Sequence, residues 1–455
     1  MKVESLSSPM ELSDHQIYHR LFPDTYTWAN LYGKIFLKWK GTTAQLFVTE
    51  PELIKEIMTD KDGWYLKQKL SGHAKKLLGD GMMVSQGEKW STVRKIANHA
   101  FHGESLKGMI PEMISSAEIM LERWEHHEGK EMEVYAEFRL LTQEVISRTA
   151  FGSSYLEGKH IFDMITKMGT IVYRNLFNVD IPGFGKILKS RDDIESDKIE
   201  KEIRDSIIGI INRRKKKVMR GEEENYGNDF LGLLMQANHD ADSSSIISVH
   251  NIIDECKIFY FAGQETTNSL LAWTIFLLAT HPDWQDEARK EVLDSFGHEN
   301  PNPEGLARLK NISMILNETL RLYFPGINLT RRVEKEVRLG KLVIPANTEL
   351  HLSPMAHHHD PEIWGPDTHL FKPERFEEGV AKATKNNILA FIPFGFGPRI
   401  CVGSNFATTE AKIALSMILQ RYEFKLSPSY VHSPYMLLAV KPRHGIPVIL
   451  RKELD

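Results

Sequence analysis

The most distinctive segment of the chain begins at Phe394 and reads Phe-Gly-Phe-Gly-Pro-Arg-Ile-Cys-Val-Gly. Its glycines, Gly395, Gly397 and Gly403, let the backbone lie close to a large flat ligand because they have no side chain to hold the ligand away. Cys401 precedes a helical pattern, and the positive potential at a helix N-terminus favours the thiolate form of cysteine. A thiolate can bind iron, and backbone N–H groups of the glycine turn can tune the metal. We therefore predict a metal ligand; a buried structural cysteine is the alternative.

A second chemical pattern interrupts a long apolar helix predicted over residues 251–280. Helical spacing places Ala262, Gly263 and Thr266 on one stripe, so that two small residues lie beside a hydroxyl group. An acid, Glu265, adjoins that hydroxyl. Because the helix is apolar on nearly every other side, we expect it to run through the centre of the molecule. A helix kinked locally by its glycine and threonine is the alternative.

Two further pairs of side chains have the spacing of one helix face. Glu318 and Arg321 lie three residues apart, and Trp90 and Arg94 lie four apart. Either pair alone could be an ordinary surface pair. The acid–base pair is followed along the chain by Arg375 in the segment Phe-Lys-Pro-Glu-Arg-Phe.

The elements that must position these residues are mainly helical. Extended patterns are minor and gather near both ends of the chain, and no repeat of 20 to 50 residues is present. A small hairpin is predicted to lead into a helix that a proline begins. We expect strands at 34–39, 45–48, 341–344, 349–352 and 439–450, and helices at 51–58, 106–124, 137–150, 160–177, 192–219, 283–296, 311–323 and 405–419.

Composition excludes several classes of protein. The 455 residues are 26% charged with a net charge of −4, which is too close to neutral for a nucleic-acid-binding surface. A mean hydropathy of −0.32 excludes a membrane protein with several spans. Two cysteines cannot form a disulfide framework in so long a chain, so we expect a reducing compartment.

Two other sets of metal-ligand side chains are interpreted as structural. Cys256 lies on the predicted central helix, where a buried cysteine packs as a small apolar side chain. The tract His357-His358-His359 cannot direct all three rings at one ion, because adjacent side chains diverge around the backbone. Asp360-Pro361 behind it indicates a turn.

The cysteine segment matches every fixed position of Phe-x-x-Gly-x-Arg-x-Cys-x-Gly and resembles the haem-binding loop of the haem-thiolate monooxygenases, the cytochrome P-450 family. The other motifs agree and occur in the family's order, and the resemblance extends over residues 33–451. It implies the cytochrome P-450 fold: mainly α with a minor β region, a single large helical domain with small β-sheets, and haem between the long central helix and the cysteine loop. The implied cofactor is haem b, iron protoporphyrin IX.

The same resemblance implies roles for the residues of the motifs. Cys401 is the axial ligand of the iron, and Phe394 shields the sulfur. Thr266 and Glu265 help to deliver protons to the reduced oxygen, and the small residues before them leave room for dioxygen. The implied haem contacts are Gly395, Gly397, Arg399 and Gly403 of the loop, Trp90, Arg94 and Arg332 at the propionates, and the small pair Ala262 and Gly263.

Two further groups are carried over by position. Glu318, Arg321 and Arg375 resemble a buried network that supports the haem loop and has no part in the chemistry. Candidate substrate segments are mostly apolar, with Asn328 as a polar anchor. These segments are 66–83, 259–266, 327–329 and 436–438, and the substrate contacts named within them are Phe259, Ile327, Asn328, Leu329 and Leu437.

Residues 97–101 and 146–155 look like the plant group that includes secologanin synthase, cytokinin hydroxylases and brassinosteroid-inactivating hydroxylases. Such proteins normally carry an N-terminal membrane anchor and a proline-rich hinge. We therefore expect residues 1–32 to be a remnant after a removed anchor, and 33–455 to be a single haem-binding catalytic domain. The native protein is then expected at the endoplasmic reticulum membrane, with this domain facing the cytosol.

The resemblance implies a monomeric monooxygenase that oxidises a small apolar substrate, such as a terpenoid, a steroid-like hormone or a xenobiotic. Because no nucleotide-binding glycine motif follows a strand, electrons should come from NADPH through NADPH-cytochrome P-450 reductase, with O2 as co-substrate and no nucleic acid as partner. An oxygen-independent haem-thiolate isomerase or dehydratase is one alternative, against which the Glu265-Thr266 pair argues. A non-catalytic haem-binding protein is the other.

Overall fold

The protein is mainly helical with small separate β-sheets, and its chain divides into two compact units. The computed structural model describes residues 8–175, 189–240, 247–326 and 328–452. The first unit comprises residues 1–66, 113–141 and 266–455, and the second comprises 67–112 and 142–265. That residues 33–455 act as one haem-binding domain remains a prediction.

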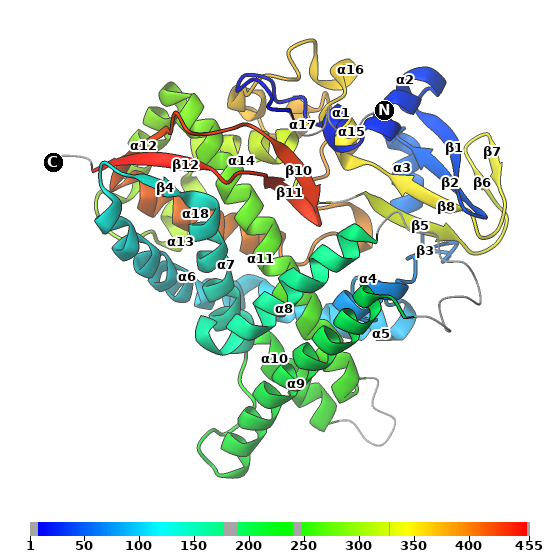
Figure 1. Ribbon diagram of the computed structural model, residues 1–455, viewed down its shortest axis with the longest axis horizontal. Coiled ribbons are helices and arrows are strands. Elements are labelled where there is room, and N and C mark those ends of the chain that lie inside the picture. Colours follow the sequence, from blue (N-terminus) through cyan, green and yellow to red (C-terminus); the bar gives the residue numbers. More distant parts are fainter. Residues whose placement is uncertain (1–7, 176–188, 241–246, 327, 453–455) are drawn as a thin grey trace. The chain divides into compact units, whose positions relative to one another are not determined.

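The first unit contains a mixed sheet in the strand order β1-β2-β8-β5-β3 (Figure 1). β2 and β8 are parallel, and the other neighbours are antiparallel. The predicted hairpin is confirmed, and the chain passes from it into α3, where Pro51 occupies the first turn. The bounds are β1 (Ile35–Lys40), β2 (Thr43–Val48), α3 (Pro51–Met58), β3 (Tyr65–Leu66), β5 (Leu329–Val333) and β8 (Glu349–Leu352).

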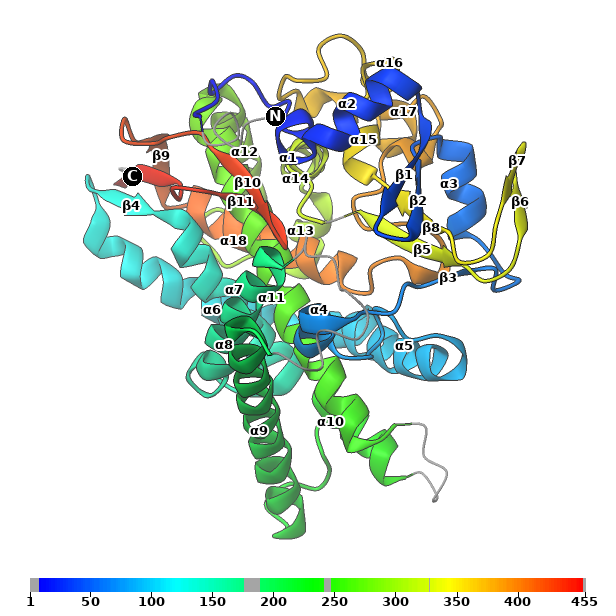
Figure 2. The same ribbon diagram turned by 45° about the vertical axis from the view of Figure 1, so that its right-hand side comes forward.

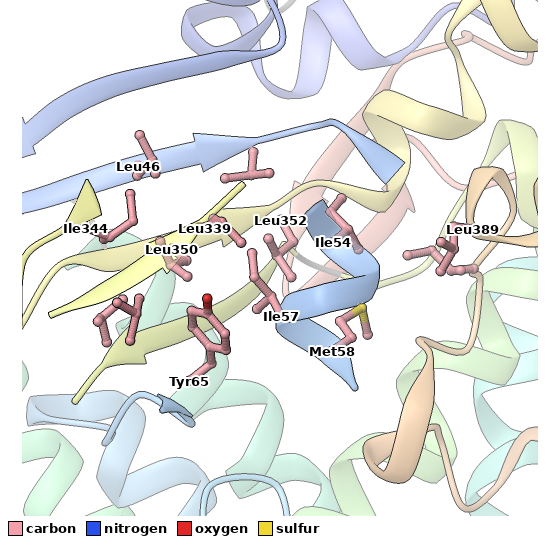
Figure 3. Packing of buried hydrophobic residues seen from close by; sticks show 14 residues of the cluster. Leu46, Ile54, Ile57, Met58, Tyr65, Leu339, Ile344, Leu350, Leu352 and Leu389 are labelled. Carbon is pink, nitrogen blue, oxygen red and sulfur yellow. The ribbon is translucent and has the colours of Figure 1, made fainter. Parts of the chain in front are cut away.

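The core of this region lies between α3 and the sheet. Ile54, Ile57 and Met58 follow helical i, i+3, i+4 spacing and are all buried. Figure 3 shows them beside Leu350 and Leu352 of β8. Burying a side chain of this size stabilises the fold by about 1.5 to 3 kcal/mol, so the packing holds α3 against the sheet.

The remaining elements of the first unit come mostly from the C-terminal half of the chain. They include α14, which carries the Glu318 and Arg321 pair, and α18, which follows Cys401. Their bounds are α1 (Tyr18–Leu21), α2 (Pro23–Tyr32), η2 (Glu125–His127), β4 (Glu131–Glu133), α12 (Pro282–Phe296), α13 (Pro303–Arg308), α14 (Lys310–Leu322), β6 (Val337–Leu339), β7 (Leu342–Ile344), α15 (Pro354–His358), α16 (Pro361–Trp364), η3 (Pro373–Phe376), α17 (Val380–Ala383), η4 (Ile388–Ala390), η5 (Gly397–Arg399), α18 (Ser404–Leu419), β9 (Tyr422–Leu426), β10 (Pro434–Leu437), β11 (Ala439–Pro442) and β12 (Pro447–Lys452).

The single strand predicted over 439–450 is wrong. The chain forms β11, which pairs with β10, and then β12, which pairs with β9 and β4 in another sheet. The turn between them contains Gly445 at φ +73°, a conformation that glycine adopts without steric cost.

The second unit is helical. Its helices α8 and α9 lie side by side (Figure 2). α9 begins with a capping box, in which the Ser190 side chain accepts from the Asp193 amide and the Asp193 side chain accepts from the Ser190 amide. The bounds are α4 (Gly72–Leu78), α5 (Gly87–Phe101), α8 (Tyr155–Arg174), α9 (Arg191–Met219) and α10 (Phe230–His239); the last residues of the helix predicted at 160–177 lie outside the described residues.

Three helices carry residues of both units: α6 (Gly103–Trp124), α7 (Val134–Phe151) and α11 (Val249–Thr280). α11 is the predicted central helix. Most of it is buried, as predicted, but its composition differs from the prediction because Asp254, Glu255, Lys257 and Asn268 are buried on it as well. Of the helices described, none combines the length and apolar composition that a membrane-spanning segment needs.

Candidate active site

The cysteine loop is a tight turn that leaves its sulfur-bearing residue exposed. The Cys401 amide donates to the Phe394 carbonyl oxygen at 2.8 Å, which closes the loop immediately before α18 begins. Cys401 is exposed, whereas Cys256 is buried on α11. Burial raises the pKa of the Cys256 thiol, so of the two sulfurs only Cys401 is placed to bind an external metal.

The glycines of this loop allow it to approach the end of α3. Gly397 has φ +72°, and a Cβ atom there would lie 2.4 Å from the Met58 carbonyl oxygen. Gly395 has φ +78°. Any larger residue at 397 would push the loop away from α3, so the buried core around Met58 also positions Cys401.

Glu318, Arg321 and Arg375 come together in the first unit. Both carboxylate oxygens of Glu318 accept from Arg321, each at 2.7 Å, and both side chains are fully buried. Arg375 lies 3.5 Å from Glu318 and binds Asp367 more closely, at 2.8 Å. Hydrogen bonds from Lys372 and Arg375 hold the pKa of Asp367 well below its usual range.

His358 connects this network to the cysteine loop. Arg321 donates to the His358 carbonyl oxygen at 2.9 Å, and the Ile392 amide donates to His358 Nε2 at 3.2 Å. The Gly395 amide then donates to the Ile392 carbonyl oxygen at 3.0 Å. The predicted support of the loop by the network thus has a continuous path of hydrogen bonds.

The histidine tract does not converge on one point. His357 Nε2 binds the Thr49 carbonyl oxygen at 2.6 Å, and His359 Nε2 binds the Leu322 carbonyl oxygen at 3.0 Å. With His358 Nε2 accepting from Ile392, each ring has a different backbone partner. Over the described residues, no three His, Cys, Asp or Glu side chains gather as a metal site would require.

The polar interruption of α11 coincides with a gap in its burial. Over residues 252–278, all of which the structure describes, every residue is buried except Phe261, Ala262, Gly263 and Thr266. These include the whole stripe predicted from helical spacing. The protein's own side chains therefore leave this face of α11 open, as a flat ligand and a small co-substrate would need.

The neighbours of the stripe differ in environment. Glu265 is 4% exposed, and its Oε1 accepts from Gln264 Nε2 at 3.1 Å. Thr142 on α7 donates to the Gln264 carbonyl oxygen at 3.2 Å. A Cβ atom at Gly263 would lie 2.7 Å from the Ile146 side chain, so the glycine is required by packing against α7. Gly263 is half-buried and Ala262 is exposed, and room for a small ligand beside them remains a prediction.

Trp90 and Arg94 both lie on α5, as their spacing predicts, and both are half-buried. Arg94 Nε donates to Asn98 Oδ1 at 3.0 Å, one turn later on the same helix. They belong to the second unit, and their approach to a propionate remains a prediction.

The two arginines of β5 have opposite environments. Arg332, the predicted propionate partner, is half-exposed and donates to Glu334 at 3.3 Å. Arg331 is 4% exposed, and burial lowers its pKa to about 10. In the part of the chain that the structure describes, Arg331 donates to the Thr330 carbonyl oxygen at 2.9 Å and forms no ion pair. A buried cation of this kind fits an anionic group of a ligand.

The predicted substrate contacts fall into three groups. Phe259 is buried, and its ring packs 4.0 Å from the Phe230 ring and 5.2 Å from the Phe101 ring, so it belongs to an aromatic core. Asn328, Leu329 and Leu437 are half-buried, and Ile327 lies outside the described residues. Leu437 precedes Leu438, which has φ +63° at the tip of the β10–β11 hairpin. A large residue in that conformation is a strained position of the kind found at ligand sites.

Comparison with known proteins decides the family. The model of the cytochrome P-450 family matches residues 14–446. The chain belongs to the cytochrome P-450 family. It is 56% identical to CYP749A22 of Panax ginseng over 99% of this chain and 86% of that protein. It is 44% identical to 11-oxo-beta-amyrin 30-oxidase of Glycyrrhiza uralensis over 99% and 87%. Retinoic acid bound cyanobacterial CYP120A1 has a TM-score of 0.82 at 23% identity, over 97% of each chain.

These findings confirm the predicted family, its plant group and its fold, and the protein is a cytochrome P-450 monooxygenase. Enzymes of this family use a haem cofactor, O2 and a redox partner, and they act on small substrates. Taken unit by unit, the features that suit this cofactor are the exposed Cys401, the half-buried Thr266 and the buried Arg331 guanidinium in the first unit, and the exposed Ala262 in the second.

Motif reading alone missed three residues: the buried Arg331, His358 between the network and the cysteine loop, and Asp367, the partner of Arg375. Two adjacent arginines on a strand point to opposite faces, so the buried one could have been sought by matching the alternation along β5. His358 acts through Arg321 and Ile392, which lie 37 and 34 residues away in sequence, and nothing local indicates it. Asp367 pairs with Arg375, eight residues later in the chain, and no motif marks that pair.

Proposed function

We propose that this cytochrome P-450 oxidises an apolar polycyclic terpenoid, using haem b, O2 and electrons from NADPH through NADPH-cytochrome P-450 reductase. The observation that carries the proposal is the open stripe on α11, where the half-buried Thr266 lies one helical turn after the exposed Ala262 and directly follows the buried Glu265. The name of the relative, 11-oxo-beta-amyrin 30-oxidase, supports a triterpenoid as the first substrate to test.

The residues that would hold the haem form two groups: the cysteine loop at the iron, and polar side chains at the propionates. Cys401 would bind the iron, Phe394 would shield the sulfur, and Gly395, Gly397 and Gly403 keep the loop backbone flat. Arg331, Arg399, Trp90 and Arg94 would bind the propionates through charge-assisted and ordinary hydrogen bonds. When bound, haem supplies the binding and reductive activation of dioxygen.

The chain's own contribution to oxygen chemistry is the control of protons. Thr266 Oγ1 would donate a proton to oxygen during its reduction, and the Glu265 carboxyl would resupply that proton. Glu265 is buried, so bulk water does not compete directly for it. The small side chain of Ala262 keeps the oxygen position clear.

The substrate would lie against apolar side chains that remain half-buried in the chain: Leu329, Leu437 and Phe261. Asn328, also half-buried, would bind a polar group of the substrate through its amide. Phe259 would support these contacts indirectly, because its ring packs in the aromatic core of the second unit. A large apolar ligand with one or two oxygens suits this set.

We also propose that residues 33–455 act as one catalytic domain, that the protein is monomeric, and that the native form is held at the endoplasmic reticulum membrane. Co-fractionation of the natural protein with microsomes, and its mass in detergent solution, test the last two statements.

The function is tested by turnover of 11-oxo-beta-amyrin with the reductase, NADPH and isotopically labelled O2. We expect one labelled oxygen atom in the product, and product without O2 or NADPH would instead support the isomerase. The ferrous-carbonyl form should show the red-shifted Soret band of thiolate ligation. Cys401→Ala should abolish that band, and the matched control Cys256→Ala should keep it.

A further inference from the structure

The segment between α4 and α5 is bound to α11 by two neighbouring carboxylates. Asp254 Oδ2 accepts from the Asp80 amide at 3.0 Å, and Glu255 Oε1 accepts from the Met82 amide at 2.8 Å. Both acids are buried, at 2% and 0% exposure. Lys89 on α5 donates to the Asp80 carbonyl oxygen at 2.8 Å, so the segment is held from both of its sides. All these residues belong to the second unit.

Two glycines make this close approach possible. Gly79 has φ +65°, and a Cβ atom there would lie 2.1 Å from Asp254 Oδ1. A Cβ atom at Gly81 would lie 2.6 Å from Ile258 Cδ1 and 2.9 Å from Glu255 Oε1. A side chain at either glycine would separate the segment from α11, so its sequence is adapted to the two carboxylates.

Glu255 shares a helix face with the open stripe. Ala262 and Thr266 follow it by seven and eleven residues, which places each about 20° from it around the helix. Seven residues correspond to about 10 Å along the helix axis. The segment held by Glu255 carries the half-buried Met82 and Met83, and methionine side chains adapt to the shape of a neighbouring ligand.

We propose that Glu255 is a positioning residue for the substrate: by holding residues 79–84 on this face of α11, it fixes one wall of the substrate chamber and decides which carbon is oxidised. Asp254 secures the same segment one residue earlier. The effect on the substrate rests on the proposed function, whereas the hold on the segment does not.

The charge on Glu255 sets the strength of this hold. Burial raises the pKa of Glu255 to about 7, against the Met82 amide and Lys89, which lower it, while Asp254 raises it further. His250 and Lys257 lie 3.6 and 3.8 Å from Asp254, Lys257 also lies 3.5 Å from Glu200, and Lys75 lies 3.1 Å from Asp80. A carboxylate accepts an amide hydrogen bond more strongly than a neutral acid does, so the hold weakens as pH falls through about 7.

Hydrogen exchange of the resting holoprotein tests the hold without any turnover. In Glu255→Ala, we expect the amides of residues 80–84 to exchange about 10-fold faster or more. Glu255→Gln keeps an acceptor oxygen and should restore slow exchange. After correction for the intrinsic exchange rate, the amide exchange rate of the wild type should change near pH 7, and that of Glu255→Gln should not. Glu88→Gln removes an exposed acid at the start of α5 and is the matched control. Unchanged exchange in Glu255→Ala overturns the proposal.

The effect on substrate is measured with 11-oxo-beta-amyrin. Glu255→Ala should keep its haem content and ferrous-carbonyl band. Its substrate dissociation constant, measured from the haem spectral shift, should rise several-fold, and its products should be oxidised at a wider range of positions. Altered exchange with an unchanged dissociation constant and unchanged products would reject the positioning role. If wild type produces no spectral shift or product with this compound, the same comparison is made with a spectral-shift ligand from a terpenoid panel, and the exchange result stands independently.

Discussion

Single side chains of the same type differ in role according to their burial. Arg331 and Arg332 are neighbours on β5, yet Arg331 is buried without an ion pair among the described residues and Arg332 faces Glu334. Cys256 and Cys401 differ in the same way. In each pair, the member in the unusual environment is the one that suits the cofactor.

Arg331→Leu should accelerate haem loss about 10- to 100-fold, because hydrogen bonds to charged groups contribute roughly 1.5 to 3 kcal/mol. The apoprotein should be no less stable, since the variant removes a buried cation. Haem transfer to an acceptor apoprotein measures the rate. Arg332→Leu is the control, and equal rates in the two variants would remove Arg331 from the propionate site.

Thr266→Ala should bind haem and substrate normally but convert more of the NADPH into peroxide, because the oxygen loses its ordered proton donor. A general acid–base loss is typically about 10² to 10⁴ in rate. NADPH, peroxide and product are measured together. Thr267→Ala changes a buried neighbour that lies off the stripe and should couple normally; unchanged coupling in Thr266→Ala contradicts the role.

At the level of elements, periodicity located the long helices well, because each buries one continuous stripe. It failed where partners are distant. Residues 439–450 have the pattern of one strand, although the chain turns at Gly445. The short strands β9 and β10 were not predicted, because they are stabilised by pairing with β12 and β11. The candidate site follows the same rule: motif residues such as Cys401 are locally encoded, whereas His358 is placed by partners 34 and 37 residues away.

The network on α14 illustrates how an element is held in place. Arg321→Ala should cost about 3 to 5 kcal/mol of the free energy of unfolding, because it leaves the Glu318 carboxylate buried and unpaired. We expect low haem occupancy as well, since Arg321 connects through His358 to the cysteine loop. Chemical denaturation and haem content are measured.

The exposed pair Lys310 and Glu377 provides the comparison for that variant. The side chains are 59% and 65% exposed and lie 3.7 Å apart, so Glu377→Gln should change stability by less than about 1 kcal/mol. Recovery of Arg321→Ala with normal haem content and with the stability of Glu377→Gln would argue against the network.

At the scale of the whole molecule, the first unit contains a set of histidines whose pKa burial lowers. Burial lowers the pKa of His432 to about 4 and of His359 to about 3, and it lowers the pKa of the others as well. Each ring binds a backbone or phenol partner in its neutral form. The set is His15, His357, His358, His359 and His432.

These histidines predict acid lability. A histidine that stays neutral when folded but titrates near pH 6.5 when unfolded contributes stability that is fully present above pH 6.5 and is lost as pH falls, by about 1.4 kcal/mol per pH unit. Glu255 acts oppositely: its pKa of about 7 makes the folded chain bind a proton first, so its contribution grows as pH falls from about 7 to 4.5. Because the histidines outnumber the buried acids Glu255 and Glu410 whose pKa is raised, stability should fall between pH 6.5 and 5.

Chemical denaturation at a series of pH values measures this loss. His359→Gln keeps an N–H donor for the Leu322 carbonyl oxygen but cannot be protonated, so its free energy of unfolding should fall less steeply below pH 6.5 than that of the wild type. His99→Gln, at an exposed position on α5, should follow the wild-type profile. If His359→Gln has the wild-type slope, the acid loss arises elsewhere, because a ring that is protonated only in the unfolded chain must contribute to that slope.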